Sequence, residues 1–396
     1  MNALGRGRSA GLLVPTLLAA TTLAAFSWIL TLRFTTLEPY QDFRFHDEVA
    51  ADLAAGEPLE LPHPLYHVLV ATLAAVSGFA VPSVGIGVAV LAQTCLALVA
   101  YFDLRAAAGG RAGVAALVAL GLTVVAPLYW LTPASREFYF GYLFPNALHS
   151  PTIILQRPFA LGLFLACAGV LAATADPPSP RTAGLALLTL LCAAAKPSYL
   201  ICLLPALGAA WLLEGRPIDR RWSALALGVL LPGALIAAAQ AVFTLTTDRM
   251  EPATIVLAPL KVVFIHTHRD VALVVVKLAL SVVFPVAVVA AFARDAVRDG
   301  ALRLAWLAFL AGALYAYGLA ETGPRMSHGN FLWSGQAAAA VLFAASARFA
   351  LARARTGERE ARGAYLRLAV CGGAFALHVA SGIGYAVHFA RTGQGF

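Results

Sequence analysis

Charged residues are scarce in this sequence of 396 residues: Asp, Glu, Lys and Arg make up only 12% of it, while hydrophobic residues make up 60%. A typical soluble domain contains about 25% charged residues. So little charge cannot cover the surface of a water-soluble protein with this many apolar side chains, whereas lipid accepts an apolar surface. The sequence therefore predicts one all-α transmembrane helical bundle over residues 1–396, a single integral membrane domain.

Lysine and paired cysteine are also nearly missing. Only three of the 28 basic residues are lysines, and the basic residues lie in short segments between apolar runs. This distribution is typical of membrane topology signals, so the net charge of +8 does not indicate nucleic acid as a partner. All five cysteines lie inside apolar runs without a CxxC pair, which argues against a disulfide framework or a metal site.

Several catalytic motifs are absent. The sequence has no glycine-rich phosphate loop, no GxSxG elbow, no HExxH and no long soluble segment, which argues against nucleotide-driven chemistry in the cytoplasm. It shows no internal repeat, and no carboxylate lies at the middle of an apolar run, where only Lys277 and His378 bring charge. Both absences weigh against a secondary transporter or lipid-linked glycan flippase, which stays open as the alternative to an enzyme. A subunit without chemistry also stays open.

Runs of about 20 mostly apolar residues predict about eleven membrane spans. The first run, 11–33, is too long for a signal peptide and has no cleavage site after it, so we expect it to remain as a helix. The stretch 182–213 is either one helix broken at Lys196-Pro197 or two helices, because a residue before proline disfavours helix. The predicted spans are 11–33, 84–104, 112–131, 158–174, 182–195, 197–213, 222–244, 270–293, 301–320, 331–349 and 365–388.

The basic residues fix the predicted orientation. If the run 63–79 dips into the outer leaflet instead of spanning, 17 of the 28 basic residues fall in cytoplasmic segments, as expected for membrane proteins. The N-terminus is then cytoplasmic. The outer side receives 12 of the 20 acidic residues and seven of the nine histidines. We therefore expect the functional face outside the cytoplasmic (inner) membrane, in outer loops at 34–83, 132–157, 245–269 and 321–330.

The first outer loop carries an early aspartate, Asp42, followed by His46, Asp47 and Glu48. Early acids and a later Gly56 suit a short helix at the membrane surface, with Asp42 and His46 on one face. The plain interpretation is an acidic, solvated helix. The functional interpretation is that Asp42 acts as a general base or positions a metal ion, with His46, Asp47 and Glu48 in support. The sequence leaves a divalent cation open.

Polar side chains in the remaining outer segments suit substrate contacts. His63 and Tyr66 begin the dipping run and are either interface anchors or ligands of a substrate. Asn146 and His149 lie in the aromatic-rich second outer segment, where they suit the binding of hydroxyl groups. The pair His266 and His268 lacks a third ligand and is weak evidence for a metal.

Three basic residues are candidates for binding an anion. Arg157 precedes a proline at the mouth of the next predicted span, and either snorkels to headgroups or clamps a phosphate. Lys196 lies beside long apolar runs and needs water or an anion. In the last outer loop, Arg325 and Glu321 are spaced to pair, with His328 nearby. The pair is either a staple for the loop or an anion-binding arginine oriented by the glutamate.

This arrangement resembles the GT-C fold glycosyltransferases, which are polytopic membrane enzymes. The features that match are Asp42 soon after the first span, a His-Pro-Leu-Tyr stretch ending at Tyr66, and a Lys-Pro-Ser break at Lys196. The resemblance is best over the first 210 residues. It implies that the protein transfers a sugar from a polyprenyl-phosphate donor to a glycan, lipid or protein acceptor. It also implies that Asp42 is the general base and that Arg157, Lys196 and Arg325 stabilise the leaving lipid phosphate.

Overall fold

The computed structural model describes residues 3–36, 41–59, 61–132, 141–144, 148–173, 179–215, 217–246, 254–267, 269–355 and 362–392. Within them, seven helices are long and apolar enough to cross a membrane, or eight if the bent pair α12–α13 is one span. This confirms a helical membrane protein, while the predicted count of eleven is not confirmed. The long helices are α1 (Ala3–Thr36), α4 (Val81–Ala107), α6 (Pro151–Ala172), α9–α10 (Arg220–Leu225 and Leu231–Thr246), α15 (Gly300–Gly318), α16 (Leu332–Arg355) and α17 (Arg362–Thr392).

Shorter elements complete the described chain. A π-helical turn (Ala226–Leu230) joins α9 to α10, and α12 (Val271–Ser281) meets α13 (Val283–Ala291) at an angle of 65°. The class prediction missed one small ribbon, in which β1 (Ile255–Leu257) pairs antiparallel with β2 (Leu319–Glu321). The other short elements are α2 (Gln41–Ala54), α3 (Leu65–Ser77), α5 (Ala112–Val124), α7 (Ser179–Ala195), α8 (Leu200–Glu214), α11 (Lys261–His266), α14 (Ala293–Ala296) and the 3-10 turns Tyr129–Leu131 and Gly323–His328.

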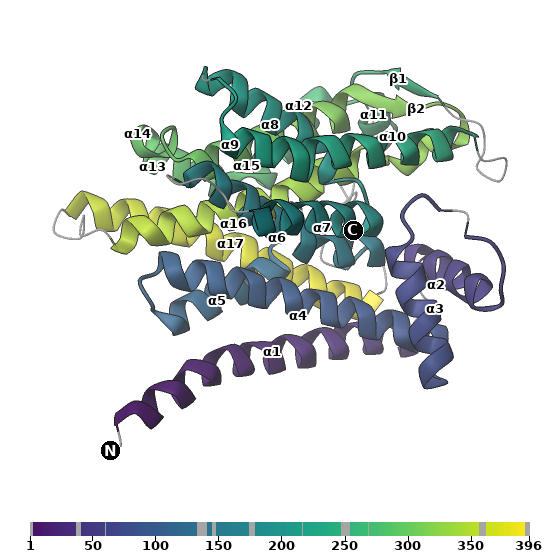
Figure 1. Cartoon of the computed structure of the whole chain (residues 1–396), viewed down its shortest axis with the longest axis horizontal. Coiled ribbons are helices and arrows are strands. Elements are labelled where there is room, and N and C mark those ends of the chain that lie inside the picture. The colour runs from purple at the N-terminus through teal and green to yellow at the C-terminus, as the bar shows by residue number, and fades with distance from the viewer. Residues whose placement is uncertain are drawn as a thin grey trace.

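The bundle has two different ends (Figure 1). The helices α2 and α3 and the β1–β2 ribbon lie at the right-hand end, whereas the α4–α5 turn and α14 lie at the left-hand end. Figure 1 also shows α3 lying across its end of the bundle, while α4 runs along the bundle. Since α3 has 13 residues, it is about 20 Å long. It is therefore shorter than the hydrocarbon core of about 30 Å.

The stretch 182–213 forms two helices. α7 ends at Ala195 and α8 begins at Leu200, with the turn Lys196–Tyr199 between them. The proline at 197 prevents Lys196 from continuing α7, as the sequence indicates. The turn therefore places Lys196 at the junction of two apolar helices instead of in the middle of one.

A non-helical segment after α5 is held inside the bundle by α17. His378 Nδ1 lies 2.7 Å from the carbonyl oxygen of Ala126, whose amide donates to the His378 carbonyl at 3.0 Å. The Ser381 hydroxyl donates to the carbonyl of Pro127. Extended backbone at membrane depth requires such partners, because lipid offers none. The role of His378 is therefore structural, because its side chain and its carbonyl both form hydrogen bonds with the backbone of Ala126.

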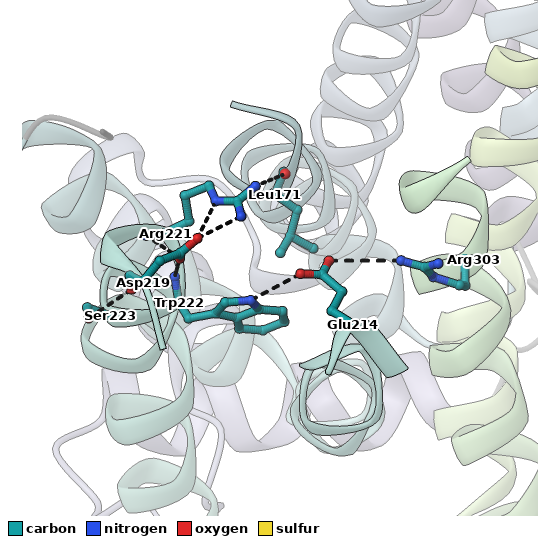
Figure 2. A network of polar contacts seen from close by, with 7 residues as sticks. All are labelled: Leu171, Glu214, Asp219, Arg221, Trp222, Ser223 and Arg303. Atoms are coloured by element: carbon teal, nitrogen blue, oxygen red, sulfur yellow. Dashed lines mark hydrogen bonds and ion pairs between the residues drawn. The ribbon is translucent and has the colours of Figure 1, made fainter. Parts of the chain in front are cut away.

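The opposite end from α2 and α3 is fastened by a polar network (Figure 2). Asp219 caps α9 by accepting from the amides of Arg221 and Trp222, and it also accepts from the Arg221 side chain at 2.6 Å. Arg221 donates in turn to the carbonyl of Leu171 at the end of α6. Glu214 on α8 accepts from the Trp222 indole at 3.3 Å and lies 3.9 Å from Arg303 on α15. Four helices are thus tied together at this end.

Candidate functional site

Two side-chain contacts join α2 to α3. His46 Nδ1 and His67 Nε2 lie 2.9 Å apart, and the Tyr66 hydroxyl donates to Asp47 at 3.0 Å. The predicted helix over the first outer loop is therefore present, and Gly56, with φ of +92°, follows its end as expected. His46, Asp47, Tyr66 and His67 are all buried. The α2–α3 pair is thus built around polar contacts, which requires specific side chains at these positions.

A third histidine completes a buried cluster, which we call the histidine cluster and define as His46, His63 and His67. The ring centres of His46 and His63 are 6.3 Å apart, those of His63 and His67 6.2 Å, and those of His46 and His67 5.1 Å. Both ring nitrogens of His63 are shielded from solvent and lack a hydrogen-bond partner among the described residues. On α10, Gln240 fixes this segment by donating to the Pro62 carbonyl at 2.8 Å.

Burial sets the protonation of these groups. It lowers the pKa of His67 to about 4 and lowers the pKa values of His46 and His63 well below their usual value, with the charge of Lys196 acting in the same direction. Burial raises the pKa of the Asp47 carboxyl to about 7, against the hydrogen bond from Tyr66. The histidine cluster is therefore neutral at pH 7, and Asp47 is an uncommonly basic carboxyl.

The charge of Lys196 acts on all three rings of the histidine cluster, and its ammonium lies between an aromatic and a hydroxyl group. Its ammonium is 4.5 Å from the centre of the Trp333 ring and 3.4 Å from the Thr152 hydroxyl. The His149 ring lies against the same Trp333, with 4.9 Å between ring centres. The Gln156 amide donates to the Lys196 carbonyl and so holds the turn from α6. Lys196 thus stands where the ends of α6, α8 and α16 meet.

Asp42 acts electrostatically on this group. Burial lowers the pKa of Lys196 to about 8 and that of His149 to about 4, and in both cases the charge of Asp42 opposes the shift. Asp42 lies in the first turn of α2, one turn before His46, and is only partly buried. A carboxylate with access to solvent thus lies within electrostatic reach of an ammonium and a histidine. Such a pairing can take up a proton and stabilise an anion in one place.

The remaining predicted residues lie elsewhere. The helix α6 begins at Pro151, not at 158, so Arg157 is buried inside the bundle, where it donates to the Leu122 carbonyl at 3.2 Å. The prediction that it stands at the mouth of a span is wrong, because six residues of the same helix precede it. Arg325 pairs with Glu321 at 2.8 Å, as the spacing predicted, and Asn330 donates to the same carboxylate.

The hypothesis of a metal ion at Asp42, Asp47 and Glu48 finds no support in the geometry. Asp47 accepts from Tyr66, whereas Glu48 pairs with Arg44 at 2.9 Å on the exposed face of α2. Within the part of the chain that the structure describes, no group of three His, Cys, Asp or Glu residues is arranged to hold a metal ion. His328 is exposed on its 3-10 turn. Asn146, His268 and the side chain of His266 lie outside the described residues.

Sequence reasoning left three residues out of the site. His63 lies just before α3 and His67 lies in its first turn, so the closeness of the two in the sequence is a usable signal. Trp333 and Thr152 had no such signal, since a tryptophan or threonine at the end of an apolar helix usually has an ordinary packing role. Only the tertiary contacts with Lys196 bring them into the site.

Comparison with protein-family models and with curated proteins finds no match for this chain.

Proposed function

We propose that the protein is a membrane glycosyltransferase that moves a sugar from a polyprenyl-phosphate donor to an acceptor on the non-cytoplasmic face. The proposal depends on one observation above all: Asp42 on α2 acts electrostatically on Lys196 and His149, which come from distant segments of the chain. A base beside an anion-binding cation is what sugar transfer from a lipid phosphate requires.

The proposed topology adds three short helices to the long helices that cross the membrane. With α5, α7 and α8 crossing as well, although they are short, the chain has the eleven crossings predicted from its sequence. The arginine-rich connections, which include Arg105, Arg111 and Arg294, then lie in the cytoplasm together with the N-terminus. In this orientation α2, α3 and Lys196 face the outside of the inner membrane. α2 and α3 serve as the interfacial helices of the first outer loop.

In the proposed mechanism, Asp42 accepts the proton of the acceptor hydroxyl as its oxygen attacks the anomeric carbon. The ammonium of Lys196 stabilises the negative charge that develops on the departing phosphate. Trp333 and His149 form one wall for the sugar. We assign Arg157 and Arg325 a smaller role in stabilising the phosphate than the sequence suggested. Arg157 donates to a backbone carbonyl, and Arg325 forms an ion pair with Glu321.

A transporter is the second candidate, favoured by one observation. The helix pair α12–α13 is bent by 65°, and α12 buries Lys277 completely, with its ammonium 4.9 Å from the centre of the Tyr142 ring. Broken spans with a buried charge are common in transporters. Equal uptake of labelled glycolipid analogues by proteoliposomes that contain wild type or Asp42→Asn would favour this candidate.

The experiment for the proposed function is mass spectrometry of lipids that copurify with the detergent-solubilised protein. Wild type is compared with Lys196→Met and with Lys261→Met, a control at an exposed lysine. We expect a polyprenyl phosphate or its glycoside in wild type and in the control, and depletion in Lys196→Met. Bulk phospholipid alone in all three proteins would contradict the proposed donor.

A further inference from the structure

The histidine cluster is not used by the mechanism above, and its hydrogen bonding is incomplete. His46 and His67 share one hydrogen bond, which needs one protonated and one unprotonated nitrogen. Both nitrogens of His63 lack a partner among the described residues although solvent does not reach them. Leaving buried polar atoms unpaired is unfavourable, because they lose their hydrogen bonds to water without replacement. Such atoms are suited to a ligand that arrives during function.

The groups that face the cluster come from several elements. The α2 helix supplies Asp42 and Asp47, α3 supplies Tyr66, the segment before α6 supplies His149, and the α7–α8 turn supplies Lys196. Asp47 is already satisfied by Tyr66, so Lys196 is the main fixed charge in reach of all three rings. The fixed charge that acts on all three rings is thus the ammonium of Lys196, and it favours an anion.

The chemistry of the proposed transfer creates such an anion. A polyprenyl-phosphate sugar is a phosphodiester with one negative charge, whereas the product is a phosphate monoester with about −1.5 to −2 charge at pH 7. The bond from the anomeric carbon to the phosphate oxygen breaks, and its electron pair remains with the phosphate. The bond from the acceptor oxygen to the anomeric carbon forms, and the acceptor releases one proton. One charge and one proton therefore appear together.

We propose that His46, His63 and His67 form a proton-accepting anion site that binds the phosphate monoester product together with the proton released by the transfer. This inference rests on the proposed function. Asp42 receives the proton first and returns to its carboxylate form when the proton moves to the cluster, since Asp42 and His46 lie one turn apart on the same face of α2. The site therefore distinguishes monoester from diester by charge.

The electrostatics follow from the surroundings. In the free protein, burial and the ammonium of Lys196 keep the pKa values of the three rings low, so the cluster is neutral. A doubly charged phosphate beside Lys196 reverses the sign of the local charge and favours an imidazolium. Binding of the monoester is thus coupled to uptake of a proton, whereas binding of a diester is coupled to it much less.

Isothermal titration calorimetry tests this directly. Farnesyl phosphate, a monoester, and its methyl diester are titrated into the detergent-solubilised protein at pH 8 in two buffers of different ionisation enthalpy. We expect wild type to take up about one proton more with the monoester than with the diester. His63→Gln, at the ring whose nitrogens have no hydrogen-bond partner among the described residues, and the double variant His63→Gln with His67→Gln should reduce this difference. His328→Gln, at an exposed histidine outside the cluster, should not.

The outcomes separate the two proposals. Binding of both ligands with equal proton uptake, or uptake that stays unchanged in both cluster variants, overturns the proton-accepting site and leaves the proposed function standing. Failure of both ligands to bind the folded wild-type protein removes the proposed donor class. A loss of the difference in His63→Gln alone, with diester binding retained, supports the inference even if the double variant does not fold.

Discussion

His46 on α2 and His67 on α3 approach each other to 2.9 Å between ring nitrogens, although they are 21 positions apart in the chain. The contact holds only when at least one ring is unprotonated, because two imidazolium rings would both present donors and would repel. Assembly of the α2–α3 pair is therefore tied to neutral histidines. This connects the stability of the site to pH.

Acid should destabilise the protein through this pair. The pKa of His67 is lowered from 6.5 to about 4, so stability is lost as pH falls from 6.5 towards 4, where the unfolded chain binds the proton and the folded chain does not. At pH 5 this costs about 2 kcal/mol for His67. Asp47, whose pKa is raised to about 7, acts in the opposite sense between pH 4 and pH 7.

The measurement is thermal unfolding of the detergent-solubilised protein at pH 7.5, 6 and 5. We expect the difference between wild type and His67→Gln to shrink as pH falls, since the variant has no proton to accept there. An identical pH dependence in the two proteins would contradict a buried, neutral His67.

Gly85 on α4 should be intolerant of a side chain. A Cβ atom at this position would lie 2.5 Å from the Asp47 carboxylate oxygen and 2.5 Å from the Tyr66 hydroxyl. Gly85→Ala is therefore expected to separate this pair and to reduce the proposed activity by 10-fold or more, an order-of-magnitude expectation for a displaced site. Gly87→Ala, two residues further along α4 with open space around it, is the control and should behave like wild type.

A side chain at Gly382 on α17 should reduce the stability of the fold and should not act on the proposed site directly. A Cβ atom there would collide with the backbone carbonyl of Val124, where the non-helical segment begins. We expect Gly382→Ala to lower the melting temperature strongly or to prevent purification. Gly373→Ala lies on the same helix with nothing near its Cβ position. It should be neutral or stabilise by up to about 1 kcal/mol, because alanine favours helix. Equal stability of both variants would show that the helices do not approach this closely.

Binding of an anionic ligand should depend on pH through the charge of Lys196. Its pKa is lowered to about 8, so its ammonium is lost as pH rises through 8, and affinity for an anionic ligand should fall over that range. Lys196→Arg keeps its charge above pH 9 and can still stack on Trp333. We expect the variant to bind the methyl diester of farnesyl phosphate, which takes up much less proton at the histidine cluster, with little change from pH 7 to 9, while wild type weakens. Lys261→Arg, at an exposed lysine, should follow wild type.

Local signals in the sequence anticipated several features correctly. The scarcity of charge indicated a helical membrane protein, Pro197 indicated the break at Lys196, and the spacing of Glu321 and Arg325 indicated their ion pair. The first depends on composition, and the other two depend on residues close together in the chain. Periodicity and proline chemistry are sufficient to predict such features.

Features that depend on packing between distant segments could not be predicted from the sequence. The meeting of Lys196 with Trp333 and Thr152 depends on how α6, the α7–α8 turn and α16 pack, which no local pattern encodes. The start of α6 was placed seven residues too late, because Pro158 was taken as a helix start although the chain tolerates it inside a buried helix. The ribbon of β1 and β2 joins residues more than 60 positions apart and has three residues in each strand.

The central claim is that Asp42 serves as the base of a sugar transfer whose phosphate leaving group is stabilised by Lys196. The most direct test is release of polyprenyl phosphate from a panel of polyprenyl-phosphate hexoses and pentoses. Proteoliposomes with a membrane extract as the acceptor source would contain wild type, Asp42→Asn or Glu48→Gln. We predict turnover by wild type and by Glu48→Gln, whose carboxylate only pairs with Arg44 on the exposed face. We predict a loss of about 100-fold or more in Asp42→Asn, with its melting temperature unchanged. Full turnover by Asp42→Asn would contradict the account.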